Sequence, residues 1–162
     1  YRPFLEKKFG GPKQLEELWQ RVSAAGRTAG IEFAFEKIEL RANTLNAHRL
    51  IHFAQTEVGA GSTPIGDLVE ALFAAQFLAG RHLGDCTVLA DVAAACGMER
   101  EAVLHYLEST ADAATVRGGA DAARRRGING VPFFIFNDRL AASGAQPPEA
   151  LLQVMRQAAA AA

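Results

Sequence analysis

The chain has 162 residues, enough for one domain with a sizeable hydrophobic core. Hydrophobic residues make up 49% of it and charged residues 22%, as in ordinary globular proteins. The formal net charge of −1 gives no overall attraction to nucleic acid or to an anionic membrane surface, and no run of 18 apolar residues predicts a membrane-spanning helix. We therefore expect neither nucleic acid nor a membrane among its partners. No signal peptide is recognisable.

Most of the chain up to residue 127 has helical periodicity of its apolar residues. The pattern predicts helices over 2–9, 12–30, 43–56, 64–78, 85–97, 103–107 and 109–126. Asn43 and Thr44 supply an N-cap for the third of these, and residues 109–112 resemble a capping box for the last. Residues 31–40 alternate apolar and charged side chains over part of their length. We expect an extended connector there, with a short strand as the alternative, and a loop over 59–62.

The most apolar and aromatic run is residues 130–136, Gly-Val-Pro-Phe-Phe-Ile-Phe. Bulky apolar residues without alternation favour a strand that is covered on both faces, and Pro132 lies at its start, where a missing N–H is tolerated. The polar turn at 137–139 and the short apolar run at 140–142 predict a β-hairpin, and Pro147-Pro148 then opens a last helix. Residues 1–127 contain no confident partner strand. The missing strands must come from outside the chain or from a weak segment within it.

Neither the cysteines nor the histidines predict a metal or redox site in this chain. Cys86 and Cys96 lie on one predicted helix, too far apart for a disulfide, and they form no C-x-x-C pair. We interpret both as small buried hydrophobes. His48 and His52 have i,i+4 spacing, but no third ligand follows, so we expect no metal. We expect Trp19 to lie in the core.

Four segments together carry a resemblance to a known family. They are residues 2–10 (RPFLEKKFG), 43–49 (NTLNAHR), 77–85 (FLAGRHLGD) and 130–149, which includes GVPFFIF and SGAQPPE. In this order and spacing they resemble the C-terminal half of the DsbA-like thioredoxin family. The likeness is greatest to the FrnE-like branch, the cytoplasmic relatives of the 2-hydroxychromene-2-carboxylate isomerases, and it implies a cytoplasmic protein.

The resemblance implies an α/β thioredoxin-like fold of the DsbA type with a large all-helical insertion. This chain would then be mostly α-helical, ending in a β-hairpin and a helix. Residues 1–127 would be the insertion domain, its last helix bridging to the sheet, and residues 128–162 would be the closing strand-strand-helix of an incomplete thioredoxin fold. The opening strand, the Cys-x-x-Cys helix and the next strand would lie upstream of Tyr1. A second copy could cover the open sheet edge, which would give a homodimer.

Pro132 matches the position that is cis in thioredoxin-like folds, so the resemblance implies a cis Val131–Pro132 bond. The main chain of Val131 would then pair with an extended peptide or glutathione and hold its sulfur beside the nucleophile. Ser143 and Gly144 precede the last helix, whose N-terminal N–H groups could bind a carboxylate such as that of glutathione. The alternatives are that Pro132 only starts an edge strand and that 143–144 is a simple turn.

The resemblance also places Asn43, Thr44 and His48 at a substrate cleft. The alternatives are an ordinary N-cap pair and a surface histidine.

Three functions follow as hypotheses. The first is a thiol-disulfide oxidoreductase that uses an upstream Cys-x-x-Cys, with the Val131–Pro132 loop positioning a disulfide-containing protein or a small-molecule thiol. The second is a glutathione-dependent isomerase of the 2-hydroxychromene-2-carboxylate isomerase type. The third is a non-catalytic helical binding module. No tightly bound cofactor is expected, and glutathione is the candidate co-substrate.

Overall fold

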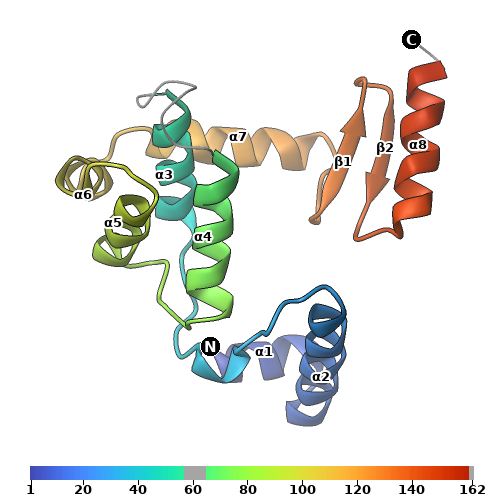
Figure 1. The fold of residues 1–162 in the computed structure, drawn as a ribbon, viewed down its shortest axis with the longest axis horizontal. Coiled ribbons are helices and arrows are strands. Elements are labelled where there is room, and N and C mark those ends of the chain that lie inside the picture. Colours follow the sequence, from blue (N-terminus) through green and yellow to red (C-terminus); the bar gives the residue numbers. More distant parts are fainter. Residues whose placement is uncertain (57–64, 161–162) are drawn as a thin grey trace. The chain divides into compact units, whose positions relative to one another are not determined.

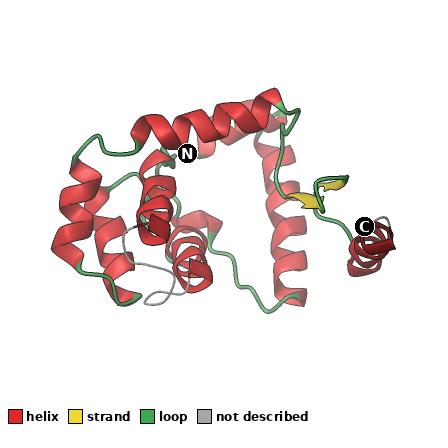
Figure 2. Ribbon diagram, turned by 90° about the horizontal axis from the view of Figure 1, so that it is seen from above, coloured by secondary structure: helices red, strands yellow, loops and turns green. Residues whose placement is uncertain are grey.

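The computed structural model describes residues 1–56 and 65–160, so the loop predicted over 59–62 lies outside the described residues. The described chain divides into two compact units, Tyr1–Val116 and Arg117–Ala162. Figure 1 labels the elements, and Figure 2 shows the predominance of helix over strand. In chain order they are α1 (Arg2–Phe9), α2 (Pro12–Thr28), η1 (Phe35–Lys37), α3 (Leu45–Thr56), α4 (Ile65–Phe77), α5 (Cys86–Ala95), α6 (Arg100–Glu108), α7 (Ala113–Arg125), β1 (Phe133–Phe136), β2 (Leu140–Ser143) and α8 (Pro148–Ala160).

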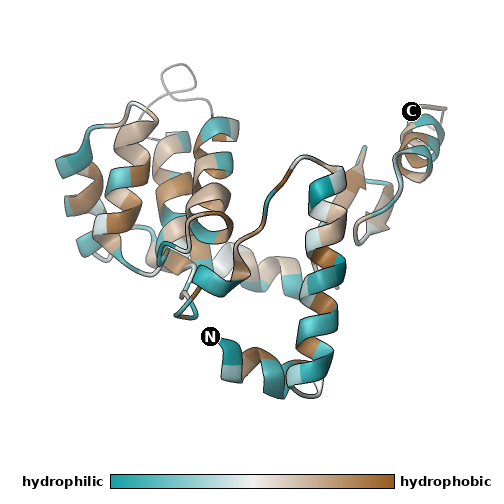
Figure 3. Cartoon of the chain, turned by 60° about the horizontal axis from the view of Figure 1, so that its bottom comes forward, coloured by the Kyte–Doolittle hydropathy of each residue, from teal (hydrophilic) through white to brown (hydrophobic). Residues whose placement is uncertain are grey.

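Helices α3 to α6 form the main hydrophobic core. Their apolar residues recur at helical spacing, and apolar stretches run along each helix of this group (Figure 3). Leu50, Leu68, Leu89 and Val103, one from each helix, are fully buried. Burial of each such side chain contributes about 2 kcal/mol to stability. The predicted apolar faces of these four helices are therefore confirmed as packing faces.

A buried arginine joins α3 to the end of α6. Arg49 is only 2% exposed, and its guanidinium uses all five N–H donors. Its Nη1 donates to the Asn46 side-chain oxygen on its own helix at 2.9 Å. The other four donors reach main-chain carbonyls at the end of α6 and in the following turn, at 2.8 to 3.0 Å: those of Tyr106, Leu107, Ser109 and Ala111. These carbonyls include ones that a helix end leaves without an intrahelical partner, so Arg49 completes the C-terminus of α6.

Residues 31–40 form the expected connector and no strand, but with a 3-10 turn, η1, that the alternation does not predict. Phe33 and Phe35 stack on each other, Phe35 also stacks on Trp19 of α2, and both meet Phe77 of α4 edge-on. Ala34 N–H donates to the Phe77 carbonyl at 2.8 Å. The apolar members of the pattern therefore pack between helices instead of alternating across a sheet.

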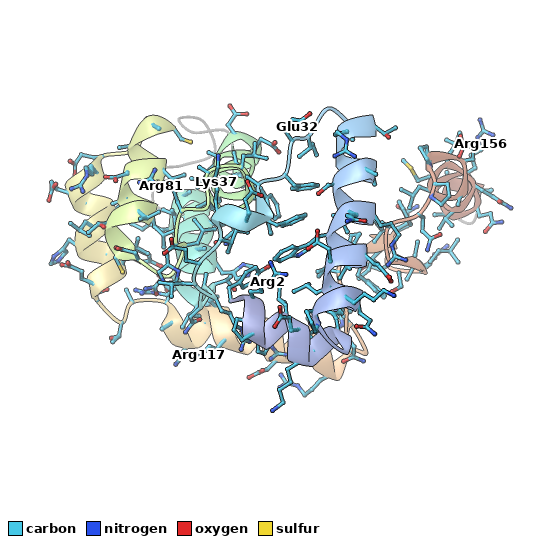
Figure 4. All side chains as sticks on the ribbon, turned by 90° about the horizontal axis from the view of Figure 1, so that it is seen from below. Arg2, Glu32, Lys37, Arg81, Arg117 and Arg156 are labelled. Carbon is cyan, nitrogen blue, oxygen red and sulfur yellow. The ribbon has the colours of Figure 1, made fainter. Side chains whose placement is uncertain are left out.

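Two further contacts lie around this connector, one at its Lys37 and one at Trp19, on which Phe35 stacks. Gly80 has φ of +70°, and an added Cβ would collide with the main chain of Lys37, so the close approach requires glycine. Arg2, labelled with Lys37 in Figure 4, places its guanidinium 5.3 Å from the centre of the Trp19 ring. Trp19 is therefore partly buried, capped by a cation on one side, and is not a deep core residue.

The predicted capping box at 109–112 is wrong. The Ser109 hydroxyl accepts from Ala111 N–H at 3.1 Å, as in a local turn. Asp112, with φ of +56°, does not reach back to Ser109, because its carboxylate accepts the Tyr106 hydroxyl at 3.0 Å. The Ser109 N–H donates instead to carbonyls of α6. The segment therefore closes α6 as much as it opens α7.

The second unit contains the predicted hairpin and last helix. β1 and β2 pair antiparallel from Phe133↔Ser143 to Phe136↔Leu140. The turn between them has positive φ at Asn137 and Asp138, the pair that suits a tight hairpin. Asn137 Nδ2 donates to the Ala158 carbonyl at 3.1 Å and so ties the turn to α8.

Within the described residues, the strand is covered on one face only, contrary to the expected cover on both. Phe134 and Phe136 are partly buried and stack on each other, whereas Ile135 between them is 48% exposed. α8 packs against both strands, and the sheet in this part of the chain has two strands. One amphipathic helix can cover only one face of so small a sheet.

No described helix is long and apolar enough to cross a membrane.

We expect Arg49→Leu to lower the free energy of unfolding by about 3 kcal/mol or more, because it removes five hydrogen bonds at once and leaves the buried Leu107 carbonyl without this donor. Urea denaturation of the chain measures the change. Arg81→Gln is the control, since Arg81 pairs with Asp91 at 2.9 Å on an exposed surface and such pairs contribute at most about 1 kcal/mol. Equal losses in the two variants would contradict the structural role of Arg49.

Tyr106 gives a second prediction. Burial first, and then the hydrogen bond to Asp112, raise the pKa of Tyr106 to about 12. Because the folded value exceeds the unfolded value of about 10, the protonated hydroxyl stabilises the fold below pH 10, and this contribution is lost as the pH rises through 12. In Tyr1→Phe, which leaves Tyr106 as the sole tyrosine, tyrosinate absorbance should rise with a midpoint near 12. A midpoint near 10, with the helical circular dichroism intact, would contradict the assignment.

Candidate functional site

The first candidate region is the start of α3. Asn43 Oδ1 accepts the Leu45 N–H at 3.1 Å, and the Thr44 carbonyl accepts the His48 N–H at 3.0 Å. Asn43 therefore caps the first turn, as the sequence predicts. The side chains of Thr44 and His48 are exposed. The side chains of Thr44 and His48 are therefore available to a ligand, whereas the Asn43 side-chain oxygen is already bonded to the backbone.

Thr44 and His48 line a cavity of about 290 Å³ in the first unit. Its volume lies near the lower end of the range for small-molecule sites. Most of its surface is apolar, and the walls come from α3, from α4 and from the segments before and after them: Tyr1, Arg41, Ala42, Thr44, Ala47, His48, Ile51, Val69, Leu72, Phe73, Gln76, Phe77 and Leu83. An apolar cavity with a few polar groups at its edge suits a small, largely apolar molecule or a single side chain.

The sequence does not predict two of the cavity's most informative residues. Phe73 belongs to the apolar pattern of α4 but is 57% exposed. Gln76 lines the same cavity, and its Oε1 is buried without a hydrogen-bond partner among the described residues. Periodicity assigns Phe73 to a helix face but cannot distinguish a face that packs from one that borders a cavity.

The second candidate region is the loop before β1. The Val131–Pro132 peptide bond is cis, and Val131 is 90% exposed. Neither the N–H nor the C=O of Val131 has a hydrogen-bond partner among the described residues. A main chain presented in this way can pair with an extended peptide, as an unpaired strand edge does.

The structure brings Ser143 and Gly144 to this loop. Ser143 pairs with Phe133 in the hairpin, and the Gly144 N–H donates to the Pro132 carbonyl at 2.9 Å. The predicted carboxylate-binding role of these two residues stays a prediction. The Gly144 N–H is not available for it in this structure, because it is already engaged.

The two cysteines and the histidine pair occupy structural surroundings. Cys86 Sγ accepts a hydrogen bond from Asn46 Nδ2 at 3.3 Å, and burial, with a smaller effect of Asp67, raises the pKa of the Cys96 thiol. A raised pKa disfavours the reactive thiolate. His52 Nε2 lies 3.8 Å from a carboxylate oxygen of Asp112. Across residues 1–56 and 65–160, no three His, Cys, Asp or Glu side chains gather as metal ligands would.

A helical unit followed by a strand-strand-helix, with an exposed loop before its first strand, is the architecture of a thioredoxin-like protein with a helical insertion. The model of the DSBA-like thioredoxin domain matches residues 4–156. The chain therefore belongs to the DSBA-like thioredoxin domain family, and the predicted DsbA-like family and fold class are confirmed, whereas the FrnE-like branch stays a prediction.

A solved structure of a probable DsbA oxidoreductase from Streptomyces coelicolor is similar to the chain. The two superpose with a TM-score of 0.84 and share 28% sequence identity, over 96% of this chain. The chain spans only 65% of the length of that protein. Among curated proteins, none matches the chain.

A substitution series at the start of α3 tests the capping role. Asn43→Ala should lower the free energy of unfolding by about 1 kcal/mol, because the Leu45 N–H loses its acceptor, whereas Asn43→Asp should keep the stability. His48→Ala, at an exposed position, should change it by no more than about 0.5 kcal/mol. Thermal or urea unfolding measures all three, and an Asn43→Ala variant as stable as the parent chain would show that the cap contributes nothing.

Proposed function

We propose that the intact protein is a thiol-disulfide oxidoreductase, in which the Val131–Pro132 loop positions the substrate. The observation that carries this proposal is the exposed loop with the unpaired main chain of Val131, in a chain that belongs to the DSBA-like family. We further propose that the reactive thiols form a Cys-x-x-Cys outside residues 1–162, in the FrnE-like manner. Cys86 and Cys96 lack that spacing, and burial raises the pKa of the Cys96 thiol.

In this mechanism, the thiolate of the first cysteine attacks one sulfur of the substrate disulfide. A new sulfur–sulfur bond joins protein and substrate, and the other substrate sulfur leaves as a thiolate and takes up a proton. The second cysteine then attacks the mixed disulfide. The protein dithiol is thereby oxidised to a disulfide, and the substrate disulfide is reduced to two thiols. Val131 would hold the substrate backbone through its N–H and C=O, so that the substrate sulfur meets the nucleophile in line.

The cavity beside α3 favours a second candidate, a glutathione-dependent isomerase acting on a small molecule. Its volume and apolar lining suit a compact substrate, and Thr44 and His48 offer polar groups at its wall. Glutathione would then supply the thiol, and Val131 would bind the glutathione backbone instead of a peptide. The two candidates differ in whether the protein's own second cysteine is needed.

The oxidoreductase proposal predicts that the intact protein, with its residues upstream of Tyr1, reduces insulin disulfides in the presence of dithiothreitol. Replacing either upstream cysteine of the Cys-x-x-Cys with serine should abolish turnover. The double variant Cys86→Ser/Cys96→Ala is the matched control and should retain the parent rate. Loss of activity in the control variant, or an intact protein without any disulfide exchange, would contradict the proposal. Turnover that needs glutathione and survives loss of the second cysteine would favour the isomerase.

A further inference from the structure

The carbonyl of Pro132 is held by one main-chain hydrogen bond. The Gly144 N–H donates to it at 2.9 Å, one step beyond the last strand pair, Phe133↔Ser143. This bond extends the hairpin beyond its ladder and anchors the loop at the residue next to Val131. Without it, the end of the hairpin nearest the loop would begin only at Phe133.

The backbone conformation of Gly144 lets the chain turn away directly after this bond. Its φ is +80°, a region that side-chain-bearing residues rarely adopt. The turn after it is held separately, because Gln146 Nε2 donates to the Ser143 carbonyl at 2.8 Å. The peptide plane that carries the Gly144 N–H is therefore fixed from both sides, by the strand pairing before it and by the turn after it.

We propose that Gly144 is a positioning residue for substrate recognition. Its N–H fixes the Pro132 carbonyl and, through it, the direction in which the Val131 main chain faces. This inference rests on the proposed function, because it assumes that Val131 pairs with the substrate backbone. It differs from the carboxylate-binding role expected from the sequence: the Gly144 N–H acts on the protein's own loop and not on the ligand.

The chain offers a matched control in Gly127, which follows α7. Gly127 has φ of +84°, and an added Cβ there would meet none of the described residues within 4 Å. At Gly144 an added Cβ would have one described neighbour, Gln146 Nε2 at 3.9 Å, which is an ordinary contact. A side chain at either position therefore creates similar backbone strain and no collision. The two positions differ in that one N–H supports the loop and the other, donating to the Arg124 carbonyl, closes a helix.

The test compares Gly144→Val, Gly144→Asn and Gly127→Val in the intact protein. Valine strongly disfavours positive φ, whereas asparagine tolerates it. We expect Gly144→Val to raise KM for a peptide disulfide about tenfold with a much smaller change in kcat, as follows from loss of a preorganised binding loop. Gly144→Asn should restore KM to near the parent value. Gly127→Val should leave KM unchanged while lowering the melting temperature about as much as Gly144→Val does.

A second readout separates positioning from damage to the nucleophile. The rate at which iodoacetamide alkylates the reactive thiol should be the same in all three variants, because that reagent does not need the loop. Equal KM values in Gly144→Val and Gly127→Val would overturn the inference, as would failure of Gly144→Asn to restore KM. If the parent protein shows no disulfide exchange at all, the proposed function is wrong. If the parent is active and the Gly144 variants behave like Gly127→Val, only the role of Gly144 is wrong.

Discussion

The helical unit depends on the hydrogen bonds that one buried, positively charged side chain makes. Arg49 has no carboxylate partner within its five hydrogen bonds and is neutralised by one side-chain oxygen and four carbonyls around the C-terminus of α6. The end of a helix carries partial negative charge, so it suits a cation. Its guanidinium also lies 4.9 Å from the centre of the Tyr106 ring. A single side chain therefore fixes α3, the end of α6 and the turn before α7, and with them the wall of the cavity that α3 provides.

Residues 43–49, one of the segments that carried the family resemblance, contain both structural residues and residues that line the cavity. Asn43 caps α3, and Asn46 accepts from Arg49 and donates to Cys86. Thr44, Ala47 and His48 line the cavity, and Thr44 and His48 are its polar members from this segment. A segment shared with a family can thus be explained mostly by folding, with two positions left for a ligand. Its presence supports the fold more directly than it supports a substrate.

The sequence predicted the parts of the structure that local rules determine. Long periodic helices, the Asn43 cap that accepts from the Leu45 N–H at 3.1 Å, and the hairpin turn at Asn137 and Asp138 all follow from spacing and turn chemistry. The sequence-based predictions were wrong where contacts between residues far apart in the chain determine the structure. Asp112 resembled a capping residue, but Tyr106 lies within reach and takes its carboxylate. Phe33 and Phe35 alternated as in a strand, but Trp19 and Phe77 offered rings to pack on. Local rules could not assemble the cavity either, because its walls meet only in the fold; the family resemblance alone placed Thr44 and His48 at a cleft.

The two candidate regions imply different kinds of selectivity. A loop that presents the N–H and C=O of Val131 recognises what all peptides share, so it confers little preference among side chains. A cavity lined by Ile51, Leu72 and Phe73 discriminates by size and polarity, since each apolar group it buries changes affinity and each unpaired polar group costs free energy. A protein that acts on many disulfides needs only the first, whereas one that acts on a single small molecule needs the second. An apolar cavity beside the exposed His48 therefore accepts a compact apolar group in preference to a large or charged one.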